Sequence, residues 1–329
     1  MNNFKSVGII GTGSFIPEKI VTNHDLAKIV DTSDEWIVSR TGIKERRFAS
    51  EEIATSDLAY EAAKKAIENA GLTPEDIDLI ILATLTPDMI LPSTACIVQD
   101  KLKAVNAAAF DLSAACSGFL YGITVAKQMV STGVNKNVVV IGAEAMSKML
   151  DMEDRNTCVL FGDGAGAVVI SEVEEGSGIL ATELGADGSG SMYLNIPGGG
   201  SRNPASHKTI DERLHFMKME GQGVFKFAVR IMSNATKKVI EKAGIELTDI
   251  DYMVPHQANI RIIEAAAKKM KLPMEKVKVN LDRIGNTSAG SIPIALDEAL
   301  KEGKINKGDN VILVGFGGGL TWGSCLIKW

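Results

Sequence analysis

The sequence lacks the features that would indicate a secreted, membrane or metal-binding protein. Its four cysteines lie far apart and form no CxxC pair, so neither a disulfide framework nor a zinc site is predicted. No apolar stretch approaches the roughly 20 residues that a membrane-spanning helix needs. The apolar run near the N-terminus is interrupted by Gly11 and Gly13, which is not typical of a signal peptide. We therefore expect a cytoplasmic protein that holds no metal and keeps its thiols reduced.

The sequence also lacks an excess of positive charge and has few aromatic residues. The 329 residues carry a formal net charge of −6 at pH 7, and 5% of them are aromatic. This pattern argues against nucleic acid as the main partner. The G-x-S-x-G of serine hydrolases, the Walker motif of NTPases and the HExxH of zinc proteases are absent too. With 45% hydrophobic residues, the chain has the composition of a globular protein with a sizeable core.

An internal repeat organises the chain. Residues 62–82 align with residues 235–255 without a gap, at an offset of 173 positions (235 minus 62), and both copies contain the pieces KK, IE, AG and DID. The same offset aligns residues 137–144 with residues 310–317. Each copy has the pattern of a helix that ends at a glycine, an acidic turn and an apolar strand, which predicts an α/β protein. We interpret the chain as two related halves.

The two halves, residues 1–173 and residues 174–329, place different reactive residues after equivalent strands. Cys116 follows an apolar strand of the first half and precedes a helical run. In the second half, His256 directly follows the repeated strand, and Asn286 precedes the helix that corresponds to the one after Cys116. Because sites in open α/β sheets lie at the carboxyl ends of strands, we expect these side chains to meet. One half then supplies a thiol, and the other supplies an imidazole and a carboxamide.

These residue types suit acyl transfer. A thiol at the start of a helix faces the partial positive charge of unpaired N–H groups, and we expect the pKa of Cys116 to be lowered. The glycine-rich residues 315–323 can supply backbone N–H groups to an oxyanion. A neutral histidine and an asparagine can together donate hydrogen bonds to an enolate oxygen. The set favours carbon–carbon bond formation at a thioester over hydrolysis.

Each of these residues has a structural alternative when it is taken alone. A cysteine between small residues is more often a buried small side chain than a nucleophile, and Cys96, Cys158 and Cys325 are interpreted in that way. His256 could be an ordinary strand-end histidine, and Asn286 could be only a helix cap. The other three histidines are interpreted as surface residues.

Six segments in a fixed order carry a family resemblance. Together they resemble β-ketoacyl-acyl-carrier-protein synthase III, of the thiolase superfamily, nearly from end to end: DTSDEWIVSRTGIKERR, DLSAACSGFLYG, FGDGAGAVV, VPHQANIRI, GNTSAGSIPIALDEAL and GFGGGLTWGS. The resemblance implies a thiolase-like duplicated α/β fold of five layers, αβαβα, and a homodimer. It also implies a Cys-His-Asn triad at Cys116, His256 and Asn286. The asparagine separates this family from elongating condensing enzymes, thiolases and hydroxymethylglutaryl-CoA synthases.

The resemblance implies a condensation in two stages and no cofactor. A short acyl-CoA, either acetyl-CoA or a branched one, acylates Cys116, with the backbone N–H groups of Cys116 and Gly318 as the oxyanion hole. Malonyl-acyl-carrier-protein then loses carbon dioxide and attacks the acyl-enzyme, which yields the 3-oxoacyl starter of type II fatty-acid synthesis. Two alternatives stay open. One is a related starter enzyme or acyltransferase of a polyketide or alkylquinolone pathway, and the other is a non-catalytic member of the fold.

The resemblance further assigns residues to three binding regions. The residues implied for CoA are Trp36, Arg40, Arg155, Asn259 and Gln222. Those implied for the acyl pocket are Phe316 and, reaching in from the partner subunit, Leu91. Those implied for the acidic acyl-carrier protein are Lys226, Arg261, Lys268 and Lys269. A leucine at position 91, where some relatives have phenylalanine, suggests that longer or branched primers are admitted.

Overall fold

The computed structural model describes residues 4–329, and the first half of the chain forms a five-stranded sheet. Its strands are β1 (Val7–Phe15), β4 (Leu79–Ala83), β5 (Ala108–Leu112), β6 (Val138–Glu144) and β7 (Gly164–Glu172). The accompanying long helices are α3 (Thr55–Asn69), α4 (Thr94–Leu102) and α5 (Gly118–Ser131). The strand order is β1-β7-β6-β4-β5. Strand β4 is parallel to β5 and β6, whereas β7 is antiparallel to β1 and β6.

The second half forms a four-stranded sheet of the same kind. Its strands are β8 (Gly178–Ala186), β11 (Tyr252–Pro255), β12 (Asn310–Gly317) and β13 (Thr321–Lys328). Its long helices are α8 (Gly221–Ala243), α9 (Ile260–Lys269) and α11 (Ser291–Lys301). The strand order is β11-β12-β13-β8, with β11 parallel to β12 and the other two pairs antiparallel.

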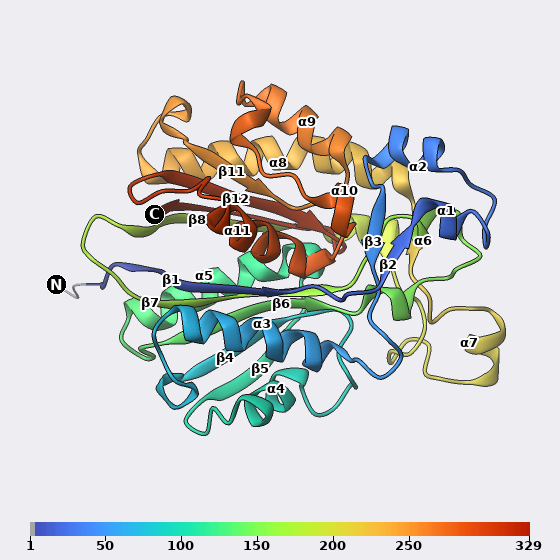
Figure 1. The fold of residues 1–329 in the computed structure, drawn as a ribbon, viewed down its shortest axis with the longest axis horizontal. Coiled ribbons are helices and arrows are strands. Elements are labelled where there is room, and N and C mark those ends of the chain that lie inside the picture. Colours follow the sequence, from blue (N-terminus) through green and yellow to red (C-terminus); the bar gives the residue numbers. More distant parts are fainter. Residues whose placement is uncertain (1–3) are drawn as a thin grey trace.

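The two sheets and their helices stack in five layers (Figure 1). Helices α5 and α11 lie between the sheets, where their apolar side chains share one core with β4, β6, β7, β12 and β13. Helices α3 and α4 cover the outer face of the first sheet, and α8 and α9 cover the outer face of the second. The thiolase-like αβαβα arrangement expected from the sequence is therefore confirmed.

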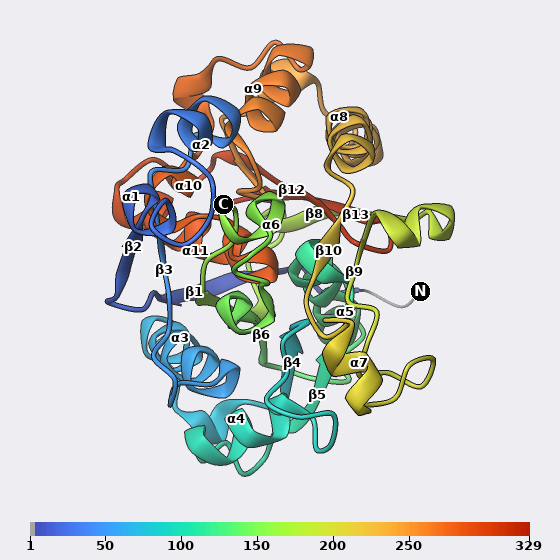
Figure 2. The same ribbon diagram turned by 90° about the vertical axis from the view of Figure 1, so that its right-hand side faces the viewer.

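Shorter elements gather at one end of the molecule, on the right in Figure 1 and facing the viewer in Figure 2. The C-terminus lies on the left in Figure 1, at the opposite end. The shorter elements are β2 (Ile20–Thr22), α1 (Asn23–Leu26), α2 (Asp34–Thr41), β3 (Glu45–Arg47), α6 (Arg155–Cys158), β9 (Leu194–Asn195), α7 (His207–Asp211), β10 (Lys218–Met219) and α10 (Leu281–Ile284).

The repeat seen in the sequence corresponds to equivalent elements in the two halves. Strands β4 and β11 begin 173 positions apart, at Leu79 and Tyr252, and helices α5 and α11 begin the same distance apart, at Gly118 and Ser291. All residues of β4 and β6 are buried. A strand that is covered by helices on both faces has no polar side, which explains the uninterrupted apolar runs that predicted these strands.

The turns before α5 and α11 are strained in the same way. Ala115 has φ +47° and Ser288 has φ +48°, and both lie in the left-handed region at positions 173 apart. Each turn packs on a glycine of the opposite half. A Cβ atom added to Gly142 of β6 would lie 2.1 Å from the carbonyl oxygen of Ala289, and one on Gly317 of β12 would lie 2.6 Å from the backbone nitrogen of Cys116. Only glycine permits this close approach of backbone to backbone.

Candidate active site

Three of the side chains singled out in the sequence line one cavity of about 820 Å³: Cys116, His256 and Asn286. Cys116 lies in a short 3-10 helix that leads into α5, His256 directly follows β11, and Asn286 follows α10. The duplicated fold brings these strand and helix ends together, because the turn before each inner helix packs against the end of a strand from the other half. The cavity thus combines residues from both halves.

The Cys116 thiol is buried and rests in its protonated form. Its residue is 4% exposed, and this burial raises the pKa of the thiol to about 12. A hydrogen bond with Ser288 acts in the opposite direction, and the nearby Glu144 carboxylate raises the pKa further. The expectation of a lowered pKa was therefore wrong for the resting site. Burial is the largest influence on this thiol and favours its neutral form.

A buried carboxylate behind the thiol was not found by sequence reasoning. Glu144 ends β6 and accepts hydrogen bonds from the hydroxyls of Ser288 (3.0 Å), Thr86 (2.7 Å) and Thr84 (3.1 Å), and from the backbone N–H of Leu85 (3.1 Å). Burial raises its pKa to about 7. The offset of 173 pairs Glu144 with Gly317, so the halves differ at this point. These bonds fix the loop after β4 to the end of β6.

The imidazole of His256 is neutral. The residue is 1% exposed, and burial lowers its pKa to about 3. Its backbone N–H donates to the carbonyl of Val314 (2.8 Å), which extends the pairing of β11 with β12 by one residue. Its ring lies edge-to-face on Phe316, with 5.3 Å between ring centroids. At neutral pH this side chain can therefore act as a hydrogen-bond donor or acceptor without carrying charge.

Asn286 combines a structural role with a free amide group. Its Oδ1 accepts the backbone N–H of Ser288 at 2.8 Å, which supports the strained turn before α11. Its backbone N–H donates a hydrogen bond to the carbonyl of Leu160, and its carbonyl accepts the N–H of Gly162. Within residues 4–329, Nδ2 has no protein acceptor, so this donor is available to the cavity. The capping alternative is not confirmed, because the N-cap residues of the 3-10 helix at 288–290 and of α11 are Thr287 and Gly290.

An aromatic ring with two arginines beside it lies on the cavity wall. The guanidinium carbons of Arg40 and Arg155 lie 5.0 and 5.2 Å from the ring centroid of Trp36, and all three residues line the cavity. Asn259 lines it too, and caps α9 by accepting the N–H of Arg261 at 2.9 Å. A flat ring beside two cations suits a planar, anionic ligand such as a nucleotide.

Comparison with known proteins identifies the family. The model of the family described as 3-oxoacyl-[acyl-carrier-protein (ACP)] synthase III matches residues 110–188, and the model of its C-terminal region matches residues 240–329. The chain is 64% identical to the β-ketoacyl-[acyl-carrier-protein] synthase III of Clostridioides difficile and 62% identical to that of Caldanaerobacter subterraneus, with 98% of both chains covered in each case. The chain belongs to the synthase III family.

Solved structures of the synthase III family agree with this assignment. The fold matches the Aquifex aeolicus 3-oxoacyl-[acyl-carrier-protein] synthase III with a TM-score of 0.91 and 52% identity, covering 98% of this chain and 100% of the other. The priming β-ketosynthase of the R1128 polyketide pathway matches with a TM-score of 0.92, 32% identity and coverage of 99% and 97%. The chain is an acyltransferase of the synthase III type that initiates fatty-acid synthesis. Because full-length fatty-acid relatives reach 64% identity, the polyketide alternative is not favoured.

The remaining residues implied by the synthase III resemblance fall into two groups. Those on the cavity wall are Gln222, Lys226, Arg261 and Phe316. Those outside this wall are Leu91, Gly318, Lys268 and Lys269. Leu91 is 84% exposed in the loop before α4, and both lysines are exposed in the last turn of α9. Gly317, next to Gly318, does line the cavity.

The sequence predicted that Cys96, Cys158 and Cys325 are buried, and this is correct for two of the three. Cys158 and Cys325 are buried, but Cys96 is exposed, because α4 turns it away from the core that Ala95 and Val98 enter. All four cysteines are unpaired.

The three histidines outside the cavity are exposed, as predicted: His24, His207 and His215. No helix in residues 4–329 is long and apolar enough to cross a membrane.

Proposed function

We propose that the protein condenses a short acyl-CoA with malonyl-acyl-carrier-protein through an acyl group carried on Cys116. The single observation that carries this proposal is the meeting of Cys116, His256 and Asn286 in one cavity. The cavity combines a nucleophile with two neutral hydrogen-bond donors. A hydrolase would instead need a base that activates water, and the low pKa of His256 reflects burial without a carboxylate to orient it.

In the first stage, the Cys116 sulfur bonds to the carbonyl carbon of the acyl-CoA and the CoA sulfur leaves. The proton of the Cys116 thiol is transferred to the departing CoA sulfur, so CoA is released as a thiol. The backbone N–H groups of Cys116 and Gly318 stabilise the oxyanion of the tetrahedral intermediate. Trp36 stacks on the adenine end of CoA, Arg40 and Arg155 contact its phosphates, and the pantetheine arm lies along the region of Asn259 and Gln222.

In the second stage, malonyl-acyl-carrier-protein loses carbon dioxide. His256 and Asn286 donate hydrogen bonds to its thioester oxygen and stabilise the enolate that forms. The enolate carbon attacks the acyl carbonyl on Cys116, the Cys116 sulfur leaves, and it takes up one proton from the solvent. The product is a 3-oxoacyl-acyl-carrier-protein. Both stages balance without a metal or redox cofactor, and we propose that none is used.

We further propose that the protein acts as a homodimer in the cytoplasm, where acyl-CoA and acyl-carrier protein are found. The loop before α4 supports the dimer, because it exposes three large apolar side chains: Met89, Ile90 and Leu91. Ile90 and Leu91 are 88% and 84% exposed in the single chain. Leu91 of each subunit would then complete the acyl pocket of its partner beside Phe316.

The test is to separate the two stages. The protein is incubated with acetyl-CoA or isobutyryl-CoA, and the acyl mass is mapped by peptide mass spectrometry. Malonyl-acyl-carrier-protein is then added. We expect an acyl group on Cys116 that is discharged into a 3-oxoacyl product with release of carbon dioxide, and the two primers are ranked by rate. An acyl-enzyme that malonyl-acyl-carrier-protein fails to discharge would indicate another acceptor and refute the condensation.

Charge reversal on α9 tests the proposed docking of the carrier protein. Lys268→Glu with Lys269→Glu is expected to lower kcat/KM for malonyl-acyl-carrier-protein by about tenfold at low salt, because both exposed cations would attract an acidic partner. The rate of acylation by acyl-CoA should be unchanged, because neither lysine lines the cavity. Steady-state and acylation rates measured separately check this.

The matched control is Lys237→Glu, which makes the same charge change on an exposed residue of α8 outside the cavity. It should leave both rates within about twofold of the unchanged protein. Arg261→Glu is a different case, since Arg261 lines the cavity and contacts the Phe225 ring, so both stages should slow. Equal losses in the lysine variant and its control would remove the docking assignment.

A further inference from the structure

The hydroxyl of Ser291 is the polar contact of His256 on the Nδ1 side of its ring. Ser291 Oγ and His256 Nδ1 lie 2.6 Å apart, and Ser291 is 2% exposed. Ser291 is the first residue of α11, whereas His256 follows β11. A neutral imidazole donates from one nitrogen and accepts at the other. The contact at Nδ1 therefore decides what Nε2 can offer to the cavity.

The hydrogens around Ser291 can be assigned by elimination. Within residues 4–329, its Oγ contacts His256 Nδ1 and the backbone N–H of Gln257, the latter at 3.5 Å. The Gln257 N–H can only donate, so it uses a lone pair of Oγ. The hydroxyl hydrogen then has Nδ1 as its acceptor. If Nδ1 carried the ring proton, this buried hydroxyl hydrogen would have no acceptor in the described structure, which buried polar groups avoid.

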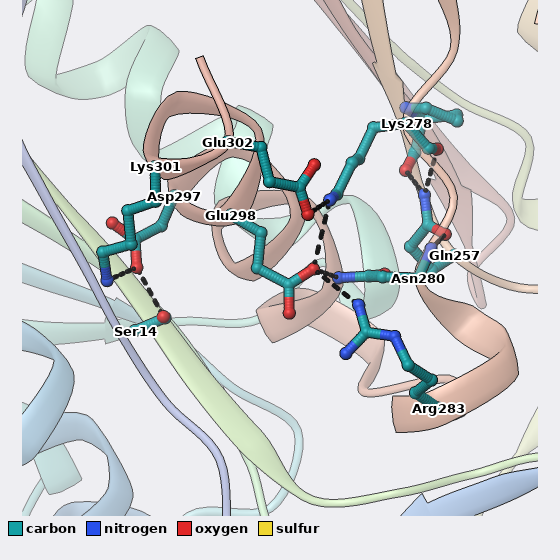
Figure 3. A network of polar contacts seen from close by, with 10 residues as sticks. Ser14, Gln257, Lys278, Asn280, Arg283, Asp297, Glu298, Lys301 and Glu302 are labelled. Atoms are coloured by element: carbon teal, nitrogen blue, oxygen red, sulfur yellow. Dashed lines mark hydrogen bonds and ion pairs between the residues drawn. The ribbon is translucent and has the colours of Figure 1, made fainter. Parts of the chain in front are cut away.

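A buried polar network holds Gln257 in place (Figure 3). The Gln257 carboxamide donates to the carbonyls of Pro255 (2.8 Å) and Lys278 (3.0 Å), and it accepts the backbone N–H of Asn280 at 3.0 Å. The Asn280 side chain donates in turn to Glu298 of α11 at 2.9 Å. Three hydrogen bonds hold the Gln257 side chain, and its backbone N–H stays directed at the Ser291 hydroxyl on α11.

The same network joins the two elements that carry the imidazole and the hydroxyl. Glu298 also pairs with Lys278 at 3.3 Å and with Arg283 at 3.2 Å. Glu298 follows Ser291 by seven residues, about two helical turns on the same side of α11. The buried Lys278 side chain comes from the segment that pairs with β11. The network therefore joins α11, at Glu298, to the segments that follow and pair with β11.

We propose that Ser291 is a positioning residue that keeps the ring proton of His256 on Nε2. The imidazole is then a hydrogen-bond donor in the cavity and has no lone pair there with which to act as a base. Nε2–H and the free Nδ2 of Asn286 both donate to the same substrate oxygen. The consequence for condensation rests on the proposed function, whereas the position of the ring proton does not.

The position of the ring proton can be measured directly. The full chain is labelled with 15N-histidine, and ring nitrogens with and without a proton are distinguished by their 15N shifts. The chain has four histidines, and the other three are exposed, so His256 is assigned by comparison with His256→Asn. We expect a protonated Nε2 and an unprotonated Nδ1 in the unmodified protein. A proton on Nδ1 would overturn the proposal, whatever the activity.

Two variants connect the ring proton to the reaction. Ser291→Ala removes the donor to Nδ1 and should lower the discharge of the acyl-enzyme by about 10- to 100-fold, with acylation by acyl-CoA within about twofold. Ser291→Asp places a carboxylate at Nδ1, which should move the ring proton to Nδ1 and lower the discharge further. The matched control is Ser324→Ala, which removes a buried hydroxyl bonded to the Ala235 carbonyl.

The outcomes separate this proposal from the proposed function. Unchanged discharge in Ser291→Ala, or an equal loss in Ser324→Ala, would refute the positioning role. If neither Ser291 variant folds, the spectrum of the unmodified protein still decides where the proton lies. A protein with Nε2–H that cannot condense acyl-CoA with malonyl-acyl-carrier-protein would refute the proposed function and leave the assignment of the ring proton intact.

Discussion

Cys116→Ala is expected to lower acyl transfer from acyl-CoA by at least about 10⁴-fold, the largest effect of any single substitution. The sulfur is the atom that bonds to the acyl group, and no neighbour can replace it. The adjacent hydroxyl of Ser117 is engaged with the Ala114 carbonyl and with Thr321, both at 2.8 Å. The measurement is the acyl mass on the intact protein after incubation with acyl-CoA, followed by peptide mapping.

Two other buried cysteines provide matched controls for Cys116→Ala. Cys158 and Cys325 are fully buried and unpaired, and burial raises the pKa of both thiols. Cys158→Ala and Cys325→Ala should keep the acyl adduct and its discharge, with a modest loss of stability from the smaller side chain. Thermal unfolding of all three variants checks that the fold is retained. An acyl adduct that persists in Cys116→Ala would show that another residue is the nucleophile.

Gly317→Ala is expected to lower the acylation of Cys116 by about 100- to 1000-fold while the chain stays folded. A Cβ at this position would lie 2.6 Å from the backbone nitrogen of Cys116 and 3.3 Å from its Cα. Both are backbone atoms, so either the turn that carries the thiol or the end of β12 must shift. The displaced group includes the Cys116 N–H that is expected to stabilise the oxyanion. The acylation rate under single-turnover conditions measures the effect.

Gly188→Ala is the matched control for this substitution. A Cβ on Gly188 would meet no atom within 4 Å, and Gly188 does not line the cavity. Acylation should fall by less than about threefold. Comparable losses in the two alanine variants would mean that the added methyl group in general, and not the position of the Cys116 N–H, controls the rate.

The internal repeat made much of the fold predictable. Apolar runs of residues 79–83 and 252–255 form β4 and β11, and the offset of 173 places Gly118 and Ser291 at the starts of the two inner helices. Periodicity and turn residues report on burial within one segment, so they are sufficient for elements that are covered on both sides. The same repeat pointed to Cys116 and His256 after strands and to Asn286 before a helix, and all three residues line one cavity.

Properties that depend on distant neighbours were not predictable. The pKa of Cys116 is raised, contrary to expectation, because the opposite half of the chain covers the thiol. Glu144 was not singled out, since its hydrogen-bond donors come from the loop after β4 and from Ser288. The exposure of Cys96 was missed because the turn of α4 toward the core depends on packing against the first sheet.

The sequence by itself determined the fold class, the duplication, the family and the residue types of the site, because these follow from local burial patterns and short motifs. The tertiary structure decided the charge state of the site residues and the hydrogen-bond partners that hold them in place. Whether His256 offers a proton or a lone pair depends on a hydroxyl 35 positions further along the chain. Such contacts form only when the two halves pack together, because hydrogen bonding and desolvation act through space and not along the chain.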